Sequence, residues 1–306
     1  MRATILLRLT ALVTGLLLIL GSGCAKRETP AAAGLRTHTL LVGNAAEPGD
    51  LDPHLASILN DQIVVNTLFE GLTLLDERTT QPLPAVAESW TTSADGLTWT
   101  FKIRAGLKWS NGDALTAGDF VTTWRRSLNP AFGADNAWYL FALKSAEAYN
   151  AKKLSDPAAM GFAAPDPHTL VLTLERPTPY LAALVSLPAW FPLNPRALEK
   201  FGALDKRGTA WTRPGNLVSN GAFQLAEWQP NARISLTKNP NHREAAQNQL
   251  ERVGFFPIET PDVEERDFRA GQLHVTFNLP VTKLASWRQQ DAARLRIDPT
   301  LQINFL

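Results

Sequence analysis

Asp52 and His54, in the segment LDPH, have the residue types and the spacing that acid–base chemistry requires. A carboxylate beside an imidazole could orient the ring as a general base. The proline between them favours a turn instead, in which the Asp52 carboxylate bonds nearby backbone N–H groups. The five histidines of the chain are dispersed, with no pair four residues apart and no cysteine nearby. This spacing favours surface and turn positions over a metal site.

Motifs for the common catalytic machineries do not occur in the sequence. It contains no Gly-x-Ser-x-Gly elbow, no phosphate loop ending in Gly-Lys-Ser/Thr, no His-Glu-x-x-His and no dinucleotide fingerprint. We therefore predict no enzymatic activity, no catalytic residue, no metal ligand and no cofactor.

The N-terminus has the pattern of an export signal. Arg2 and Arg8 precede the apolar run Leu9–Leu20, which is too short to span a bilayer comfortably. The small residues GSG and then Cys24, the single cysteine, follow it and resemble a bacterial lipoprotein cleavage and lipidation site. We predict a lipoprotein signal peptide over 1–23, lipidation at Cys24 and a flexible tether over 24–37. The alternative is an ordinary Cys24 within a signal peptide that is cut elsewhere.

Composition and charge describe a globular protein. The 306 residues are 45% hydrophobic and 19% charged, which is enough apolar material for one large domain or two ordinary ones. The formal net charge is +1 and the charges are scattered, so we predict no nucleic-acid partner. A lone cysteine excludes an internal disulfide.

The centre of the chain alternates between strand and helix patterns. Trp99, Phe101 and Ile103 alternate with polar residues, which predicts a strand with one apolar face. The dipeptide Asn-Gly at 111–112 then predicts a turn. Thr116 lies three residues before an aspartate and predicts a capped helix start, with the helix ending at the Asn-Pro of 129–130 and with Arg125 and Arg126 away from its apolar face.

Local patterns predict four more elements. Apolar spacing predicts a helix that starts at Asn60 and stops near Gly71. Alternation predicts a hairpin over Ser219–Asn239. The segment DVEERDFRAGQ predicts a helix closed by its glycine, with residues 264–267 on a solvated face, and LHVTFNL, Leu273–Leu279, predicts a strand.

Several of these segments together resemble one family. The stretch AESWTTSADGLTWTFKIRAGLKWSNGDALTAGDFVTTWRRSLNP, with LDPH, LFEGL, DPHTLVLTLERPTPY, ALEKFG, WTRPGNLVSNGAFQLAEW, KNPNH and RAGQLHVTFN in order, resembles the family 5 extracytoplasmic solute-binding proteins of peptide ABC importers. The resemblance covers about 40–306. Departures are Gln272 and His274, where acidic residues are usual, and His242, where an aromatic residue is usual.

The resemblance implies a fold and its division into lobes. The fold would be α/β, a multi-lobe periplasmic-binding-protein fold of the class II type with mixed sheets. Lobe I would comprise 38–68 and 195–301, and lobe II would comprise 69–194. Residues 302–306 would begin a third lobe, so the resemblance implies that this C-terminal lobe is missing from the chain.

The resemblance also implies a ligand and a site. The ligand would be a peptide, held by strand-like hydrogen bonds to its backbone and by hydrated side-chain pockets. The implied ligand-binding residues are Ser57, Ile58, Leu59, Asn136, Phe277 and Asn278. The first three would pair with the peptide backbone, the fourth would line a pocket, and the last two would form the floor of the cleft.

Partners and alternatives are implied by the same resemblance. The partners would be the permease and ATPase subunits of an ABC transporter, and the protein would lie in the periplasm, lipid-anchored to a membrane. Without a third lobe, we expect this chain alone to bind peptides weakly or not at all. A relative that binds a dipeptide, a murein peptide, nickel or haem is an alternative, and an exported hydrolase-like lipoprotein is a less favoured one.

Overall fold

The computed structural model describes residues 27–297, which form two four-stranded sheets. The strands of the first, in spatial order, are β1 (Thr39–Gly43), β10 (Arg252–Phe256), β9 (Arg233–Lys238) and β8 (Phe223–Gln229). β1 runs parallel to β10 and the other neighbours are antiparallel, so the sheet is mixed. The predicted hairpin is confirmed as β8 and β9, with Asn231 at its tip in the left-handed region, φ 58°.

The second sheet is antiparallel throughout. Its strands, in spatial order, are β4 (Ala87–Thr92), β5 (Thr98–Ile103), β7 (Thr169–Thr173) and β6 (Phe162–Asp166). The predicted alternation is confirmed on β5, where Trp99, Phe101 and Ile103 are buried. A separate hairpin is formed by β2 (Thr73–Leu75) and β3 (Pro82–Pro84).

The longest helix begins and ends where its sequence signals predict. α4 (Ala117–Leu128) starts after Thr116, whose N–H donates to the Asp119 carboxylate at 3.0 Å. The turn before it has Gly112 at φ 90°, a conformation that glycine adopts without strain. Trp124 of α4 packs edge-on against Trp190, with ring centroids 5.1 Å apart, and so joins the helix to the core.

Shorter helices complete the chain. The α-helices are α2 (Pro30–Arg36), α3 (Leu59–Leu68), α5 (Ala146–Asn150), α6 (Leu181–Leu184), α7 (Pro195–Lys200), α8 (Pro261–Arg269) and α9 (Leu284–Gln290). The 3-10 helices are η1 (Ala137–Leu140), η2 (Pro157–Ala159), η3 (Pro188–Trp190), η4 (Ala210–Thr212), η5 (Val281–Lys283) and η6 (Ala292–Arg294). α3 begins one residue before the predicted start and ends three residues before the predicted Gly71.

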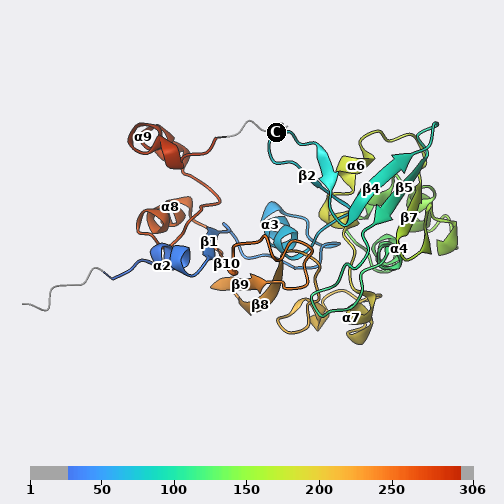
Figure 1. The fold of residues 1–306 in the computed structure, drawn as a ribbon, viewed down its shortest axis with the longest axis horizontal. Helices are drawn as coiled ribbons and strands as arrows, with labels where there is room; N and C mark the ends of the chain where they lie inside the picture. Colours follow the sequence, from blue (N-terminus) through green and yellow to red (C-terminus); the bar gives the residue numbers. More distant parts are fainter. Residues whose placement is uncertain (1–26, 298–306) are drawn as a thin grey trace, which may run out of the picture.

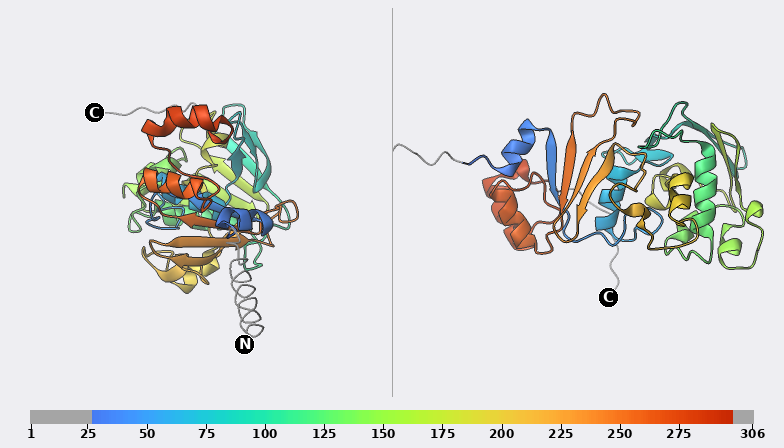
Figure 2. Two further views of the ribbon diagram at one scale, coloured as in Figure 1. Left: turned by 90° about the vertical axis from the view of Figure 1, so that its left-hand side faces the viewer. Right: turned by 90° about the horizontal axis from the view of Figure 1, so that it is seen from below.

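The arrangement is elongated (Figure 1). The β1 sheet lies in the middle, α2, α8 and α9 lie at one end, and the β5 sheet with α4 lies at the other. The right-hand view of Figure 2 shows the same order from below, and the left-hand view looks along the long axis from the end that carries α8 and α9. Two clusters of buried side chains form the core. The first comprises Leu55 and buried residues between 72 and 190, and the second comprises other buried residues between 51 and 69 and between 191 and 255. The predicted lobe limits stay a prediction.

The predicted tether is wrong for residues 29–37, because they form a docked helix. Thr29 caps α2 by accepting a hydrogen bond from the Ala32 N–H at 3.2 Å. The Ala31 N–H donates to the Gly271 carbonyl at 2.9 Å. A seven-residue helix is marginal alone, so this packing stabilises it. Residues 1–23, Cys24 and the predicted lobe III start at 302–306 lie outside the described residues.

Three charged side chains that the sequence assigned to polar faces are buried. Arg126 of α4 is 3% exposed, and Glu264 and Glu265 of α8 are 0% and 3% exposed. Each has partners far away in the chain, which a local charge pattern does not reveal. The predicted strand over Leu273–Leu279 is reduced to one bridge, between Val275 and Val42 of β1.

Candidate functional site

The predicted backbone-pairing segment is exposed. Ser57, Ile58 and Leu59 all lie at the surface, with Ile58 48% and Leu59 60% exposed. Ile58 is extended at φ −108° and ψ 157°, and Leu59 is the first residue of α3. The N–H groups of Ser57 and Ile58 have no acceptor among residues 27–297. The extended part is therefore shorter than predicted, but it offers free donors that an added strand could use.

Asn136 lies beside this segment. Its side-chain amide donates to the Ala56 carbonyl at 2.8 Å, so the structure brings the predicted pocket residue next to Ser57. η1 follows directly and presents Trp138, which is 56% exposed and stacks on Tyr139 with centroids 3.7 Å apart. No sequence pattern indicated Trp138, because core packing is the default for a tryptophan. An exposed aromatic side chain is typical of binding surfaces.

Phe277 and Asn278 line a different part of the molecule. They contribute to a cavity of about 800 Å³ together with Leu35 of α2, Glu265 of α8 and Trp287 of α9. The backbone N–H groups of both residues donate to the Glu264 carboxylate, each at 3.0 Å.

The end of β1 connects the two parts. The side chain of Asn44, the residue after β1, donates to the Asn60 carbonyl at 3.3 Å, and the Asn60 side chain donates back to the Asn44 carbonyl. Gly43, the last residue of β1, lies directly against the Glu264 carboxylate. β1 and β10 are parallel, so their carboxyl ends share one edge, the edge at which ligands bind in open α/β sheets.

We name the six predicted residues, Ser57, Ile58, Leu59, Asn136, Phe277 and Asn278, the β1-end surface. The structure ties all six to the end of β1 through the contacts of Ala56, Asn60 and Glu264. No sequence pattern indicated Gly43, Asn44 or Glu264 as supports. Their assignment to ligand binding stays a prediction.

A buried charged cluster lies under Ser57. Asp52 accepts from the Arg126 guanidinium at 2.5 Å and from the His54 N–H at 3.0 Å, which confirms the predicted turn. Arg126 also bonds His54 Nδ1 at 3.2 Å, so Nε2 carries the ring proton and donates to the Phe191 carbonyl at 3.1 Å. Burial first, and then Arg126, lowers the pKa of His54 to about 4, against the opposing pull of Asp52.

This cluster is structural in character. Asp52, His54 and Arg126 are each at most 3% exposed, so no ligand reaches the imidazole. The Leu55 and Ala56 N–H groups both donate to the Asp52 carbonyl at 2.9 Å. The cluster therefore fixes the chain that leads into Ser57, and it joins α4 to the loop before α3.

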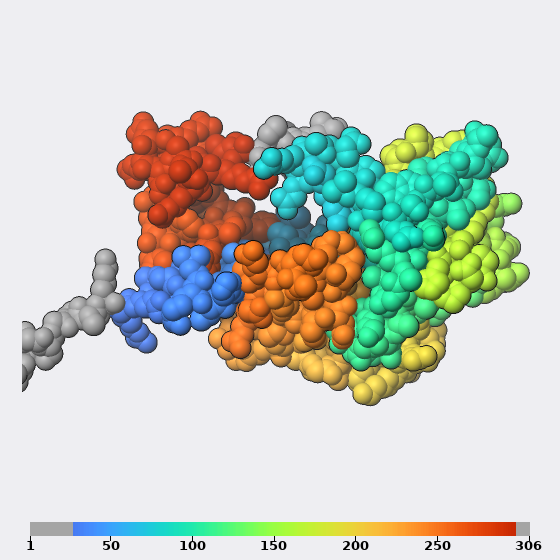
Figure 3. All heavy atoms as spheres, viewed as in Figure 1, coloured from blue at the N-terminus to red at the C-terminus, as the bar shows by residue number. Residues whose placement is uncertain are grey.

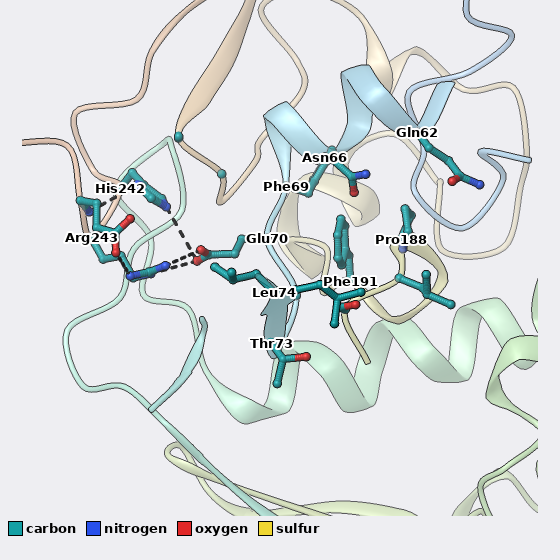
Figure 4. Close-up of a pocket in the computed structure, with 17 residues that line it drawn as sticks. Gln62, Asn66, Phe69, Glu70, Thr73, Leu74, Pro188, Phe191, His242 and Arg243 are labelled. Carbon is teal, nitrogen blue, oxygen red and sulfur yellow. Dashed lines mark hydrogen bonds and ion pairs between the residues drawn. The ribbon is translucent and has the colours of Figure 1, made fainter. Parts of the chain in front are cut away.

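A second cavity, of about 450 Å³, opens between α3, β2 and the segment after β9 (Figure 4). Phe69 and Phe191 supply its apolar lining, while Glu70 pairs with Arg243 at 2.7 Å and faces His242 at 3.7 Å. Burial raises the pKa of Glu70, but hydrogen bonds from His242 and Arg243 outweigh it and hold the pKa below its ordinary value. Figure 3 shows this hollow between β2 and the segment after β9.

Two other features are absent from the described part of the chain. Residues 27–297 hold no group of three or more His, Cys, Asp or Glu side chains placed to bind a metal ion. None of their helices has both the length and the apolarity for a membrane span.

Comparison with known proteins identifies the family to which the chain belongs. The family model described as bacterial extracellular solute-binding proteins, family 5 Middle, matches residues 81–306. The chain belongs to the family 5 solute-binding proteins. The family consists of solute-binding proteins, not enzymes, in agreement with the prediction of no enzymatic activity.

Family 5 relatives share this sequence and fold. The chain is 34% identical over 287 residues to the periplasmic oligopeptide-binding protein OppA of Salmonella typhimurium, covering 93% of the chain and 51% of OppA. It is 33% identical over 264 residues to the probable deoxycholate-binding periplasmic protein YgiS of Escherichia coli, covering 86% and 48%. A crystal structure of Haemophilus influenzae OppA in complex with RPPGFSPFR matches with a TM-score of 0.78 at 33% identity, covering 83% and 48%.

The chain thus spans about half the length of the family 5 relatives it matches. These neighbours confirm the predicted fold class, an α/β periplasmic-binding-protein fold with mixed sheets.

Proposed function

We propose that this chain is part of the substrate-binding component of a peptide ABC transporter and that the β1-end surface binds the peptide backbone. The observation that carries the proposal is the pair of free N–H groups at Ser57 and Ile58 on an exposed, extended segment. A peptide of any sequence offers carbonyl groups to such donors, so backbone pairing accepts varied side chains. The family and its oligopeptide-binding relatives support this choice of ligand.

Leu59→Pro tests the backbone pairing with little cost to the fold. Leu59 is the first residue of α3, where proline is favoured, and Ile58 already has the extended conformation that a following proline requires. The Leu59 N–H, like those of Ser57 and Ile58, has no acceptor among residues 27–297, and the substitution removes this third donor of the segment. Leu59→Ala is the matched control, because it removes the exposed side chain and keeps the donor.

We expect Leu59→Pro to weaken peptide binding by about tenfold, the effect of one lost hydrogen bond to a ligand. Leu59→Ala is expected to change it much less. Both are measured by NMR titration with a pool of tripeptides to pentapeptides. Equal affinity in wild type and Leu59→Pro would remove this segment from the site.

We infer that the β1-end surface forms one side of the site. The chain spans about half the length of its relatives, so the 306 residues alone are expected to bind peptides only weakly. Isothermal titration calorimetry of the chain with the same pool tests this. Tight, saturable binding to the 306-residue chain would contradict it.

The class of ligand has an alternative that a relative's name supports. YgiS is described as a probable deoxycholate-binding protein, and other relatives are described as binding dipeptides or murein peptides. Nickel or haem binding, implied by the family resemblance, is a further alternative. Deoxycholate added to the calorimetric series separates the cases. A bile acid has few backbone-like groups, so its affinity is expected to be insensitive to Leu59→Pro.

The proposed setting is the periplasm, with Cys24 lipid-anchored to a membrane and with permease and ATPase subunits as partners. The export pattern of residues 1–23 and the periplasmic relatives support it. Cys24→Ser is expected to release the protein from the membrane fraction. Wild-type protein that is already soluble in the periplasmic extract would contradict the anchor.

A further inference from the structure

Glu264 is a fully buried acidic residue whose hydrogen-bond partners are backbone N–H groups. Its side chain, on α8, is 0% exposed, and its two oxygens accept the N–H groups of Phe277 and Asn278 at 3.0 Å each. A carboxylate away from water needs such donors, because an unsatisfied charge in the interior is costly. Two consecutive backbone amides therefore serve as its partners, and the carboxylate in turn fixes their direction.

The carboxylate also interrupts the pairing along β1. The Val275 N–H donates to the Leu41 carbonyl at 3.3 Å, and the Gly43 N–H donates to the Val275 carbonyl at 2.9 Å, as in a parallel ladder. The next donor in that ladder is the Phe277 N–H, which would bond the Gly43 carbonyl. It bonds Glu264 instead.

Gly43 makes room for this interruption. A Cβ atom at residue 43 would overlap Glu264 Oε1, because the carboxylate already occupies the space that a side chain would need. Only a residue without a side chain lets the carboxylate lie between the end of β1 and the segment after Val275. The strand predicted over Leu273–Leu279 is therefore limited to the single bridge at Val275.

We propose that Glu264 is a positioning residue for ligand binding: it holds the backbone of Phe277 and Asn278 off the β1 edge, so that both residues line the 800 Å³ cavity. This inference rests on the proposed function. Glu264 would act through the backbone of residues that contact the ligand and would make no ligand contact itself.

Glu265 provides a matched control on the same helix. It is 3% exposed and accepts from Trp287 Nε1 at 3.0 Å and from Lys283 Nζ at 2.9 Å, and it also bonds Arg269. These partners lie on α8, η5 and α9, and neither Phe277 nor Asn278 is among them. Substitution of either acid removes a buried charge from α8. Only substitution of Glu264 also changes the acceptors of the Phe277 and Asn278 N–H groups.

Amide hydrogen exchange decides the positioning without any ligand. Glu264→Gln keeps the shape of the side chain but replaces one acceptor by a donor that faces an N–H group. We expect exchange at Phe277 and Asn278 to rise at least tenfold in Glu264→Gln and to stay unchanged in Glu265→Gln. Unchanged exchange at both amides in Glu264→Gln overturns the proposal. If Glu264→Gln does not fold, Gly43→Ala disturbs the same contact from β1 and has the same expected pattern.

Peptide titration then tests the link to binding. Glu264→Gln is expected to weaken binding of the peptide pool at least fivefold, whereas Asp262→Asn, at an exposed acid of α8 that does not line the cavity, is expected to leave it unchanged. Equal binding by wild type and Glu264→Gln, or equal weakening by the two substitutions, contradicts a positioning role. If wild type binds no peptide at all, the proposed function fails, and the exchange rates still decide whether Glu264 fixes residues 277–278.

Discussion

The triplet Asp-Pro-His occurs twice in this chain, at 52–54 and at 166–168, and the two copies have opposite environments. Both form the same turn, in which the histidine N–H donates to the aspartate Oδ1, at 3.0 Å for His54 and 2.8 Å for His168. The first copy is buried, whereas Asp166 and His168 are exposed at the hairpin between β6 and β7.

Only the buried copy has long-range partners. Arg126 of α4 bonds both Asp52 and His54. The central carbon of its guanidinium lies 3.9 Å from the centroid of the Phe132 ring. The pKa of His54 falls to about 4 because of burial. A local pattern therefore fixes the turn, whereas partners from distant parts of the chain decide whether the turn is buried in a core.

Removing Arg126 is expected to have the largest effect on this comparison. Arg126→Met leaves the Asp52 carboxylate buried without its cation, which costs about 3–5 kcal/mol in the free energy of unfolding. Urea unfolding followed by circular dichroism measures it. Arg125→Met is the control, because Arg125 is exposed on the same helix. A loss as small as that of the control would show that the ion pair does not stabilise the junction.

The pH dependence of stability is expected to differ between the copies. His54 has a folded pKa of about 4, below the ordinary 6.5, so its neutral form is favoured in the folded state. Its contribution is complete above pH 6.5 and is lost as the pH falls towards 4, by about 3 kcal/mol in total. Urea unfolding between pH 4 and 7 is expected to show this loss in wild type and a flatter curve in His54→Gln.

His168→Gln is the matched control for that experiment, since it removes the exposed imidazole of the same triplet. Curves that change equally in both variants would assign the acid sensitivity to the turn itself and not to burial.

The smallest expected effect comes from the exposed acid. Hydrogen bonds from the His168 N–H and from Thr169 lower the pKa of Asp166, so this carboxylate stabilises the fold above its ordinary pKa and less as the pH falls. Asp166→Asn is expected to lower the Tm slightly at pH 7 and to have no effect near pH 2. Differential scanning calorimetry at both values measures it. A decrease in Tm larger than that of His54→Gln would contradict the expectation that the exposed triplet contributes less to stability than the buried one.

Features of the fold that depend on neighbouring residues could be predicted from the sequence, whereas features that depend on long-range contacts could not. The β5 alternation, the start of α4 and the β8–β9 hairpin were predictable because periodicity, caps and turns act within a few residues. The helix α2 was missed because it is short and depends on Gly271 and His274, more than 230 positions away. Glu264 and Arg126 were misread because each looks polar locally and finds its partners only in the folded chain.

The sequence by itself determined the family, the β5 strand, the α4 helix, the β8–β9 hairpin and the local turns of this protein, since these depend on residue types at short spacing. The tertiary structure alone decided which charges are buried, why residue 43 is a glycine, and how residues 57–59, 136 and 277–278 come to share the end of β1. Those properties depend on contacts between distant segments, and a carboxylate is stable in the interior only where such contacts supply its donors.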